Sequence, residues 1–137
     1  MKHITLSATL IFAAVSALSQ TTRVSTPQYL AIDSMDNVFA ALQYGIIKIT
    51  PDGTITNLTK QAGTIGDLDR KWSNLIVDSK DNLYANDGKL IYRFTFDRTG
   101  KFVGSIYAGQ QWSYKLEDGP LATAGFNTIG LMTIDKN

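Results

Sequence analysis

A twelve-residue segment of this chain occurs twice, and this repetition constrains the fold more than any other feature. YLAIDSMDNVFA at positions 29–40 returns as NLIVDSKDNLYA at positions 74–85, with Asp, Ser, Asp, Asn and Ala in the same places. Lys48 and Arg93 are also 45 positions apart, the same interval as Asp33 and Asp78. A repeated unit of this size buries its apolar faces against its neighbours. The sequence therefore predicts a chain of similar units that pack in succession.

Each repeat has the pattern of four short strands joined by turns. Apolar and β-branched runs alternate with Gly, Asn and Asp, as in the turn Pro51-Asp52-Gly53. The expected strands are 29–32, 38–41, 46–50 and 54–59 in the first repeat, and 75–78, 83–85, 89–95 and 101–107 in the second. Four strands in a period of about 40–45 residues are typical of β-propeller blades. The predicted fold class is all-β, an incomplete β-propeller with two four-stranded antiparallel blades and the start of a third.

The repeats resemble NHL repeats, a family of β-propeller blades, of the kind found in secreted proteins. The family core, aliphatic-x-Asp-x-x-Gly/Asp-Asn-aliphatic-aromatic, is matched by residues 32–39, and its Arg/Lys-Ile strand and Pro-Asp-Gly turn by residues 48–53. Residues 107–135 are similar to the long loop between blades, with Asp118-Gly119-Pro120 in the family's place. The short links Leu42–Gly45 and Asp87-Gly88 depart from the longer charged link of many members. Surfaces that bind RNA or acidic partners are therefore not expected.

The pattern divides the chain into a leader and a repeat region. We expect a signal peptide at 1–19, because a short basic start is followed by an apolar run and then by Ala17-Leu18-Ser19. The repeat region, 20–137, holds blade one at about 27–60, blade two at about 73–107, an inter-blade loop at 108–128 and the start of blade three at 129–137. Propellers close with about four to eight blades. The expected partners are therefore further blades, in a larger protein of which this is a fragment or in other copies of the chain.

The composition after cleavage excludes several kinds of site. Loss of Lys2 lowers the 13 basic residues to 12, equal to the number of acidic residues, so the net charge is zero and nucleic acid is not an expected partner. The single His is His3, and the chain has no Cys. Thiol nucleophiles, His bases and the usual zinc ligands are then lacking. We expect a secreted or periplasmic protein with no membrane span after cleavage, no metal site and no cofactor.

Binding is expected at the end of the sheets where the long loops lie. In a meander, successive turns alternate between the two ends, so the links near 42–45 and 86–88 share one end with the inter-blade loops. Loops on a rigid scaffold commonly carry binding residues. The candidate contact residues are Gln43, Tyr44, Asn86, Asp87, Trp112 and Tyr114. We expect Trp72, which directly precedes a strand, to pack between the blades instead.

The acidic turns lie at the opposite end and have two interpretations. Asp33 and Asp78, with the Asp and Asn that follow them, offer oxygen ligands suited to calcium. The same residue types stabilise turns by accepting hydrogen bonds from their own backbone. Their occurrence in both repeats favours the structural role, so calcium is not the favoured cofactor.

Two functions from different classes remain open at this stage. The first is a secreted β-propeller module that binds a protein or glycan partner through its inter-blade loops. The second is a propeller enzyme of the lactonase or amidating-lyase kind, a class that related propellers resemble. Its metal site would then lie in further blades. Such enzymes need Glu, Asn, Asp or His from several blades, and this chain has one Glu, Glu117, in a loop. The sequence favours binding, with no catalytic residue assigned.

The leader gives a first testable expectation. Expressed with its own N-terminus, the protein should leave the cytoplasm with Gln20, or a residue within a few positions of it, at its new N-terminus. N-terminal sequencing of the exported protein measures this. Retention of Met1 in the exported protein would contradict the signal-peptide interpretation.

Overall fold

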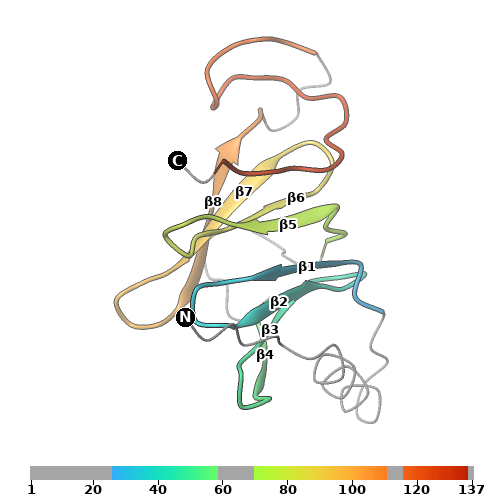
Figure 1. Ribbon diagram of the computed structural model, residues 1–137. Helices are drawn as coiled ribbons and strands as arrows, with labels where there is room; N and C mark the ends of the chain where they lie inside the picture. Colours follow the sequence, from blue (N-terminus) through green and yellow to red (C-terminus); the bar gives the residue numbers. More distant parts are fainter. Residues whose placement is uncertain (1–25, 59–69, 111–115, 136–137) are drawn as a thin grey trace.

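The computed structural model describes residues 26–58, 70–110 and 116–135, and these form an all-β structure (Figure 1). The strands of the first sheet are β1 (Tyr29–Ile32), β2 (Val38–Ala41), β3 (Ile46–Ile49) and β4 (Ile55–Asn57), and those of the second are β5 (Asn74–Val77), β6 (Leu83–Asn86), β7 (Ile91–Phe96) and β8 (Phe102–Ala108). Both sheets are four-stranded with neighbours in chain order. Within the described ranges there is no helix, and hence none long and apolar enough to cross a membrane.

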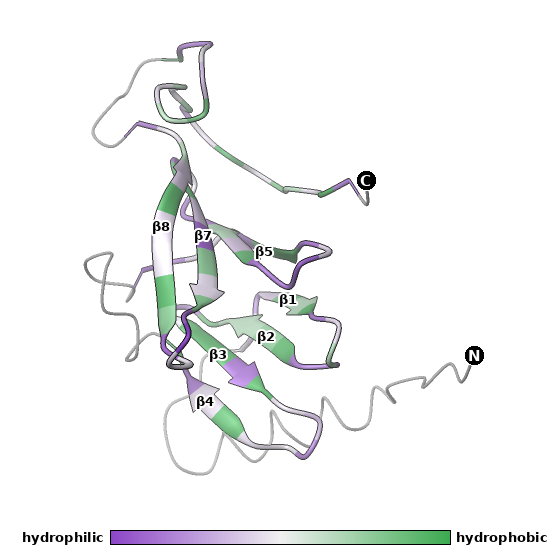
Figure 2. Cartoon of the chain, turned by 90° about the vertical axis from the view of Figure 1, so that its left-hand side faces the viewer, coloured by the Kyte–Doolittle hydropathy of each residue, from purple (hydrophilic) through white to green (hydrophobic). Residues whose placement is uncertain are grey.

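Both sheets are antiparallel meanders in the predicted order. Val38 pairs with Ile49 in the first sheet, and its counterpart Leu83 pairs with Phe94 in the second, so the two sheets share one register. Apolar residues dominate the strands and hydrophilic residues most of the turns (Figure 2). The β7–β8 hairpin lies slightly C-terminal to its predicted range, because its backbone pairing extends to Phe96 and Phe102.

The segment 129–135, expected to begin a third blade, contains no strand. It is held by isolated contacts rather than by a backbone ladder: the Ile129 amide donates to the Gly88 carbonyl at 2.7 Å, and the Asn86 side chain donates to the Gly130 carbonyl at 3.1 Å. The first sheet makes a similar isolated contact with the segment that leads into β5, because the Gly45 amide donates to the Arg70 carbonyl at 3.4 Å. The segment 129–135 is thus bonded to a turn of the second sheet, just as the lead-in to β5 is bonded to a turn of the first.

The two sheets pack face to face around a shared apolar core. β1 and β5 lie side by side at the contact (Figure 1). The core takes buried side chains from both sheets and from the segment before β5: Phe39, Ala41, Ile46, Leu58, Trp72, Leu75, Leu83, Ala85, Leu90, Tyr92, Phe94 and Phe102. Trp72 is fully buried and packs edge-on against Tyr92 and Phe94, with ring centroids at 5.4 and 5.6 Å. The predicted packing of Trp72 between the repeats is confirmed.

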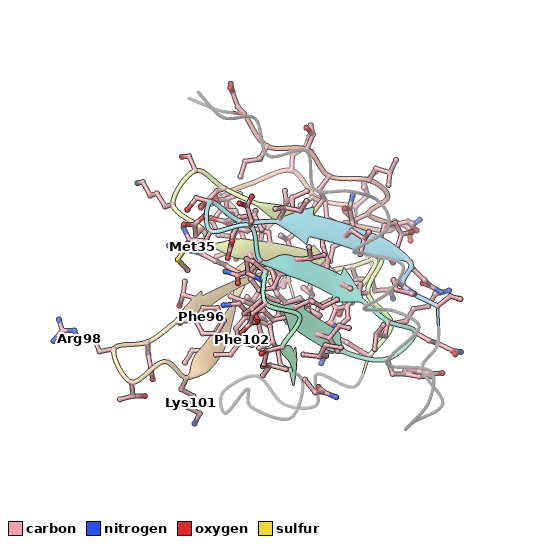
Figure 3. The ribbon with its side chains drawn as sticks, turned by 60° about the horizontal axis from the view of Figure 1, so that its bottom comes forward. Met35, Phe96, Arg98, Lys101 and Phe102 are labelled. Carbon is pink, nitrogen blue, oxygen red and sulfur yellow. The ribbon has the colours of Figure 1, made fainter. Side chains whose placement is uncertain are left out.

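Lys48 makes a second connection between the sheets. Its Nζ lies 6.0 Å from the centroid of the Phe39 ring in its own sheet and 5.0 Å from that of Phe96 in the second. Phe96 and Phe102 are the strand residues that flank the β7–β8 turn, whereas Arg98 and Lys101 extend outward from the turn itself (Figure 3). An ammonium over aromatic faces adds an electrostatic attraction to the apolar contact.

The repeated acidic turns have the same geometry in both sheets. Asp33 Oδ1 accepts hydrogen bonds from the backbone amides of Met35 and Asn37, and Oδ2 accepts one from the Asn37 side chain at 2.7 Å. Asp78 repeats all three contacts with Lys80 and Asn82. These carboxylates replace the backbone partners that the turn lacks, which supports the structural role that the sequence favoured.

One hydrogen-bonded contact joins the two turns across the inter-sheet boundary. Asp81 Oδ1 accepts from the Ser34 amide at 2.8 Å, and Oδ2 accepts from the Ser34 hydroxyl at 2.6 Å. We call this pair the turn clasp. Asp81 has a φ of 60° and its counterpart Asp36 a φ of 61°, so both adopt the left-handed conformation. The clasp thus links equivalent turns of successive repeats.

Replacing Asp33 or Asp78 by Ala should lower the free energy of unfolding by about 1–2 kcal/mol, because each change leaves turn amides without their acceptor. Urea denaturation of each variant measures the loss. The exposed Asp118 provides the control, since Asp118→Ala should change stability by less than about 0.5 kcal/mol. Equal stability of Asp33→Ala, Asp78→Ala and the control would contradict this assignment.

Candidate functional site

The candidate site lies at the end of the sheets opposite the acidic turns. There the β2–β3 link closes by a hydrogen bond from the Leu42 amide to the Gly45 carbonyl at 3.0 Å. Gly45 has a φ of 93°, which glycine adopts without strain. The tip of this tight link presents Gln43 and Tyr44, both exposed, with 59% of Tyr44 accessible to solvent. Two predicted contact residues are therefore presented to solvent from a short, well-defined turn.

Next to this tip, the lead-in to β5 and the second sheet form a polar network. Arg70 Nη1 donates to Asp87 Oδ2 at 2.8 Å and to the Tyr92 hydroxyl at 2.5 Å. The Tyr92 hydroxyl donates to Asp87 Oδ2 at 3.1 Å, and Asp87 Oδ1 accepts from the amides of Lys89 and Leu90. The Arg70 guanidinium also lies 5.1 Å from the centroid of the Tyr92 ring. Asp87, a predicted contact residue, is thus held in place on several sides.

The network shifts the ionisation of both acidic members. Burial raises the pKa of Asp87, but the amides of Leu90 and Lys89, followed by Arg70 and Tyr92, outweigh it and bring the pKa below its ordinary value. Burial, followed by the negative charge of Asp87, raises the pKa of Tyr92 to about 12. At neutral pH the network therefore consists of a carboxylate, a guanidinium and a neutral phenol.

The other predicted contact residues divide into two groups. Asn86 is fully buried; its side chain donates to Gly130 and accepts from the Gly88 amide at 3.0 Å. A buried amide with both ends bonded to backbone serves the fold, so Asn86 contributes nothing to the exposed surface. Trp112 and Tyr114 lie outside the described residues.

Sequence reasoning missed Arg70 and Tyr92. Arg70 is 17 positions from Asp87 and 22 from Tyr92, and no local pattern indicates such contacts. Tyr92 follows the apolar alternation of its strand, which predicts burial but not the partner of its hydroxyl. A buried tyrosine near the start of a strand needs a hydrogen-bond partner for its hydroxyl, and this need is the one signal that could have indicated a polar network.

Among residues 26–58, 70–110 and 116–135, no group of three His, Cys, Asp or Glu side chains is placed to hold a metal ion. The chemistry available at the loop end is hydrogen bonding through Gln43 and stacking or apolar contact through Tyr44. The network behind them is a paired carboxylate and guanidinium with a neutral phenol, so it has no net charge and no free reactive group.

No family model matches the sequence, and no curated protein matches it. Among solved structures, the fold is similar to an auxiliary nutrient binding protein from Bacteroides ovatus, with a TM-score of 0.57 and 21% sequence identity. The match covers 72% of this chain and 25% of that one, so the chain spans about a quarter of the length of the neighbour. At this identity the likeness concerns the fold.

The Asp87 network predicts a pH-dependent stability. Because the folded pKa of Asp87 is lowered, its contribution is present above the unfolded value near 3.8 and is lost as pH falls through the folded value. Asp87→Asn keeps an acceptor oxygen but removes the charge, so it should cost about 1–2 kcal/mol at pH 7 and progressively less as the pH falls below the unfolded value near 3.8. Urea denaturation across this pH range measures the difference. A cost that does not change with pH would contradict the prediction.

Proposed function

We propose that this chain forms successive blades of an NHL-like β-propeller, and that it acts as a secreted binding module for a protein or glycan partner. Two four-stranded antiparallel meanders with the same register, joined face to face by one core, support the blade arrangement. The 45-residue interval between the repeats agrees with it. In this arrangement, the loop end would lie on one of the two faces of the ring, where its turns are accessible to a partner.

The observation that carries the binding proposal is the exposure of Tyr44 on a tight turn. Tyrosine offers a flat apolar face together with a hydroxyl, and it is enriched at binding surfaces because few of its torsions must be fixed. Gln43 beside it adds an amide that donates and accepts hydrogen bonds. The Arg70–Asp87–Tyr92 network keeps the adjoining surface fixed, which reduces the entropy lost on binding.

The solved structure from Bacteroides ovatus supports the binding class, since it is described as a nutrient binding protein. A glycan is the nutrient whose chemistry suits this surface best. Sugar rings stack their apolar faces on exposed aromatic side chains, and their hydroxyl groups pair with amides such as that of Gln43. A protein partner would use the same tyrosine as an anchor.

The proposal is tested by screening the full chain against an array of polysaccharides and measuring the best binder by calorimetric titration. Tyr44→Ala should weaken that binding at least about tenfold, which corresponds to the loss of one aromatic contact. Met35→Ala is the matched control, because Met35 is similarly exposed, at 65%, but belongs to the acidic-turn end. If no glycan binds, a protein partner is tested instead. Exported proteins are captured on the full chain and on its Tyr44→Ala and Met35→Ala variants, and the amounts captured are compared. Equal effects of Tyr44→Ala and Met35→Ala would overturn the proposed site.

A further inference from the structure

The turn clasp forms once among the described residues, although each repeat contains both the serine that donates and the aspartate that accepts. Ser34 of the first repeat donates and Asp81 of the second accepts. The counterparts of these residues are Ser79 and Asp36, and both are exposed. Within residues 26–58, 70–110 and 116–135, neither side chain has a hydrogen-bond partner. The first repeat thus holds an acceptor, Asp36, in the conformation that Asp81 uses to bind a neighbouring turn.

β1, the strand that precedes the Asp36 turn, also differs from its counterpart in the second sheet: its apolar residues are exposed where those of β5 are covered. In the second sheet, Leu75 is 3% exposed, because it packs into the core shared with the first sheet. Its counterpart Leu30 is 47% exposed, and Ile32, the counterpart of the core-packed Val77, is 49% exposed. Leu30 and Ile32 alternate along β1 with Tyr29 and Ala31, which face the second sheet. The outward side of β1 is therefore apolar and uncovered at positions that the second repeat covers.

From these two observations we infer that Leu30, Ile32 and Asp36 form a docking surface for another repeat of the same kind. The occupant is a first strand like β1 followed by an Asp-Ser turn. Its strand covers Leu30 and Ile32 as β1 covers Leu75 and Val77, and its seryl amide and hydroxyl donate to Asp36 as Ser34 donates to Asp81. The existing contact between the two sheets is the template for this contact.

The chemistry of the surface selects its partner. A carboxylate in this conformation accepts two parallel hydrogen bonds, one from a backbone N–H and one from a hydroxyl, and the Asp-Ser turn supplies both. An apolar strand without that turn would leave Asp36 unpaired, and a turn without the strand would leave Leu30 and Ile32 exposed. This inference rests on the proposed blade arrangement, but it is independent of ligand binding by Tyr44.

The test duplicates one repeat period, so that the chain runs from residue 1 to 73 and then continues from 29 to 137. The inserted copy places a β1-like strand and an Asp-Ser turn directly ahead of the native first repeat. In the parent chain, Asp36→Ala should lower the melting temperature only slightly, through the strain of alanine in a left-handed conformation, whereas Asp81→Ala should lower it by several degrees more. In the duplicated chain, Asp36→Ala of the native repeat should lower it by about 2–4 °C.

A second variant separates a direct contact from a general loss of stability. Ser34→Ala in the inserted copy should lower the melting temperature by an amount similar to Asp36→Ala, and the double variant should lose no more than either one. Additive losses, or an equal effect of Asp36→Ala in the parent and duplicated chains, would overturn the inference. So would a duplicated chain without a cooperative melt. Because Tyr44 takes no part, loss of glycan binding and loss of this contact are distinguished.

Discussion

The structure depends on the apolar layer between the two sheets, with Trp72 at its centre. Neither sheet can cover its inner face alone, and edge-on packing of Trp72 against Tyr92 and Phe94 fixes the segment that enters β5. Because Trp72 is anchored, Arg70 two positions earlier is brought next to Asp87 and Tyr92. The arrangement of the loop end therefore follows from the packing of the core.

The two ends of the sheets use their polar residues differently. At the acidic-turn end, Asp33, Asp78 and Asp81 are bonded to turn backbone or to the turn of the neighbouring repeat. At the loop end, Arg70, Asp87 and Tyr92 are bonded to one another, and the exposed ring of Tyr44 lies on the neighbouring turn. One end thus maintains the stacking of the repeats, and the other presents an exposed tyrosine. This division is the physical basis for placing the proposed binding surface where it is.

The strands, turns and buried tryptophan could be predicted because each is encoded locally. Alternating apolar residues, the Asp-Asn turns and the position of Trp72 before a strand were sufficient, and the strand ends differed by only one or two residues. Contacts between distant residues could not be predicted in the same way. The burial of Asn86 depends on the later segment near Gly130, and the clasp joins Ser34 to a residue 47 positions away. The absence of a strand at 129–134 likewise reflects missing backbone pairing, which the apolar pattern of that segment does not encode.

The left-handed backbone of Asp36 and Asp81 has a consequence for the evolution of such repeats. Glycine would adopt this conformation without strain, whereas aspartate costs about 1 kcal/mol there. At Asp81 the two bonds from Ser34 offset that cost. Substitution to glycine should therefore be tolerated in a repeat whose preceding neighbour lacks the serine, and selected against where the serine is present. The residue at this one position would then record, in the sequence alone, which repeats are in contact through their turns.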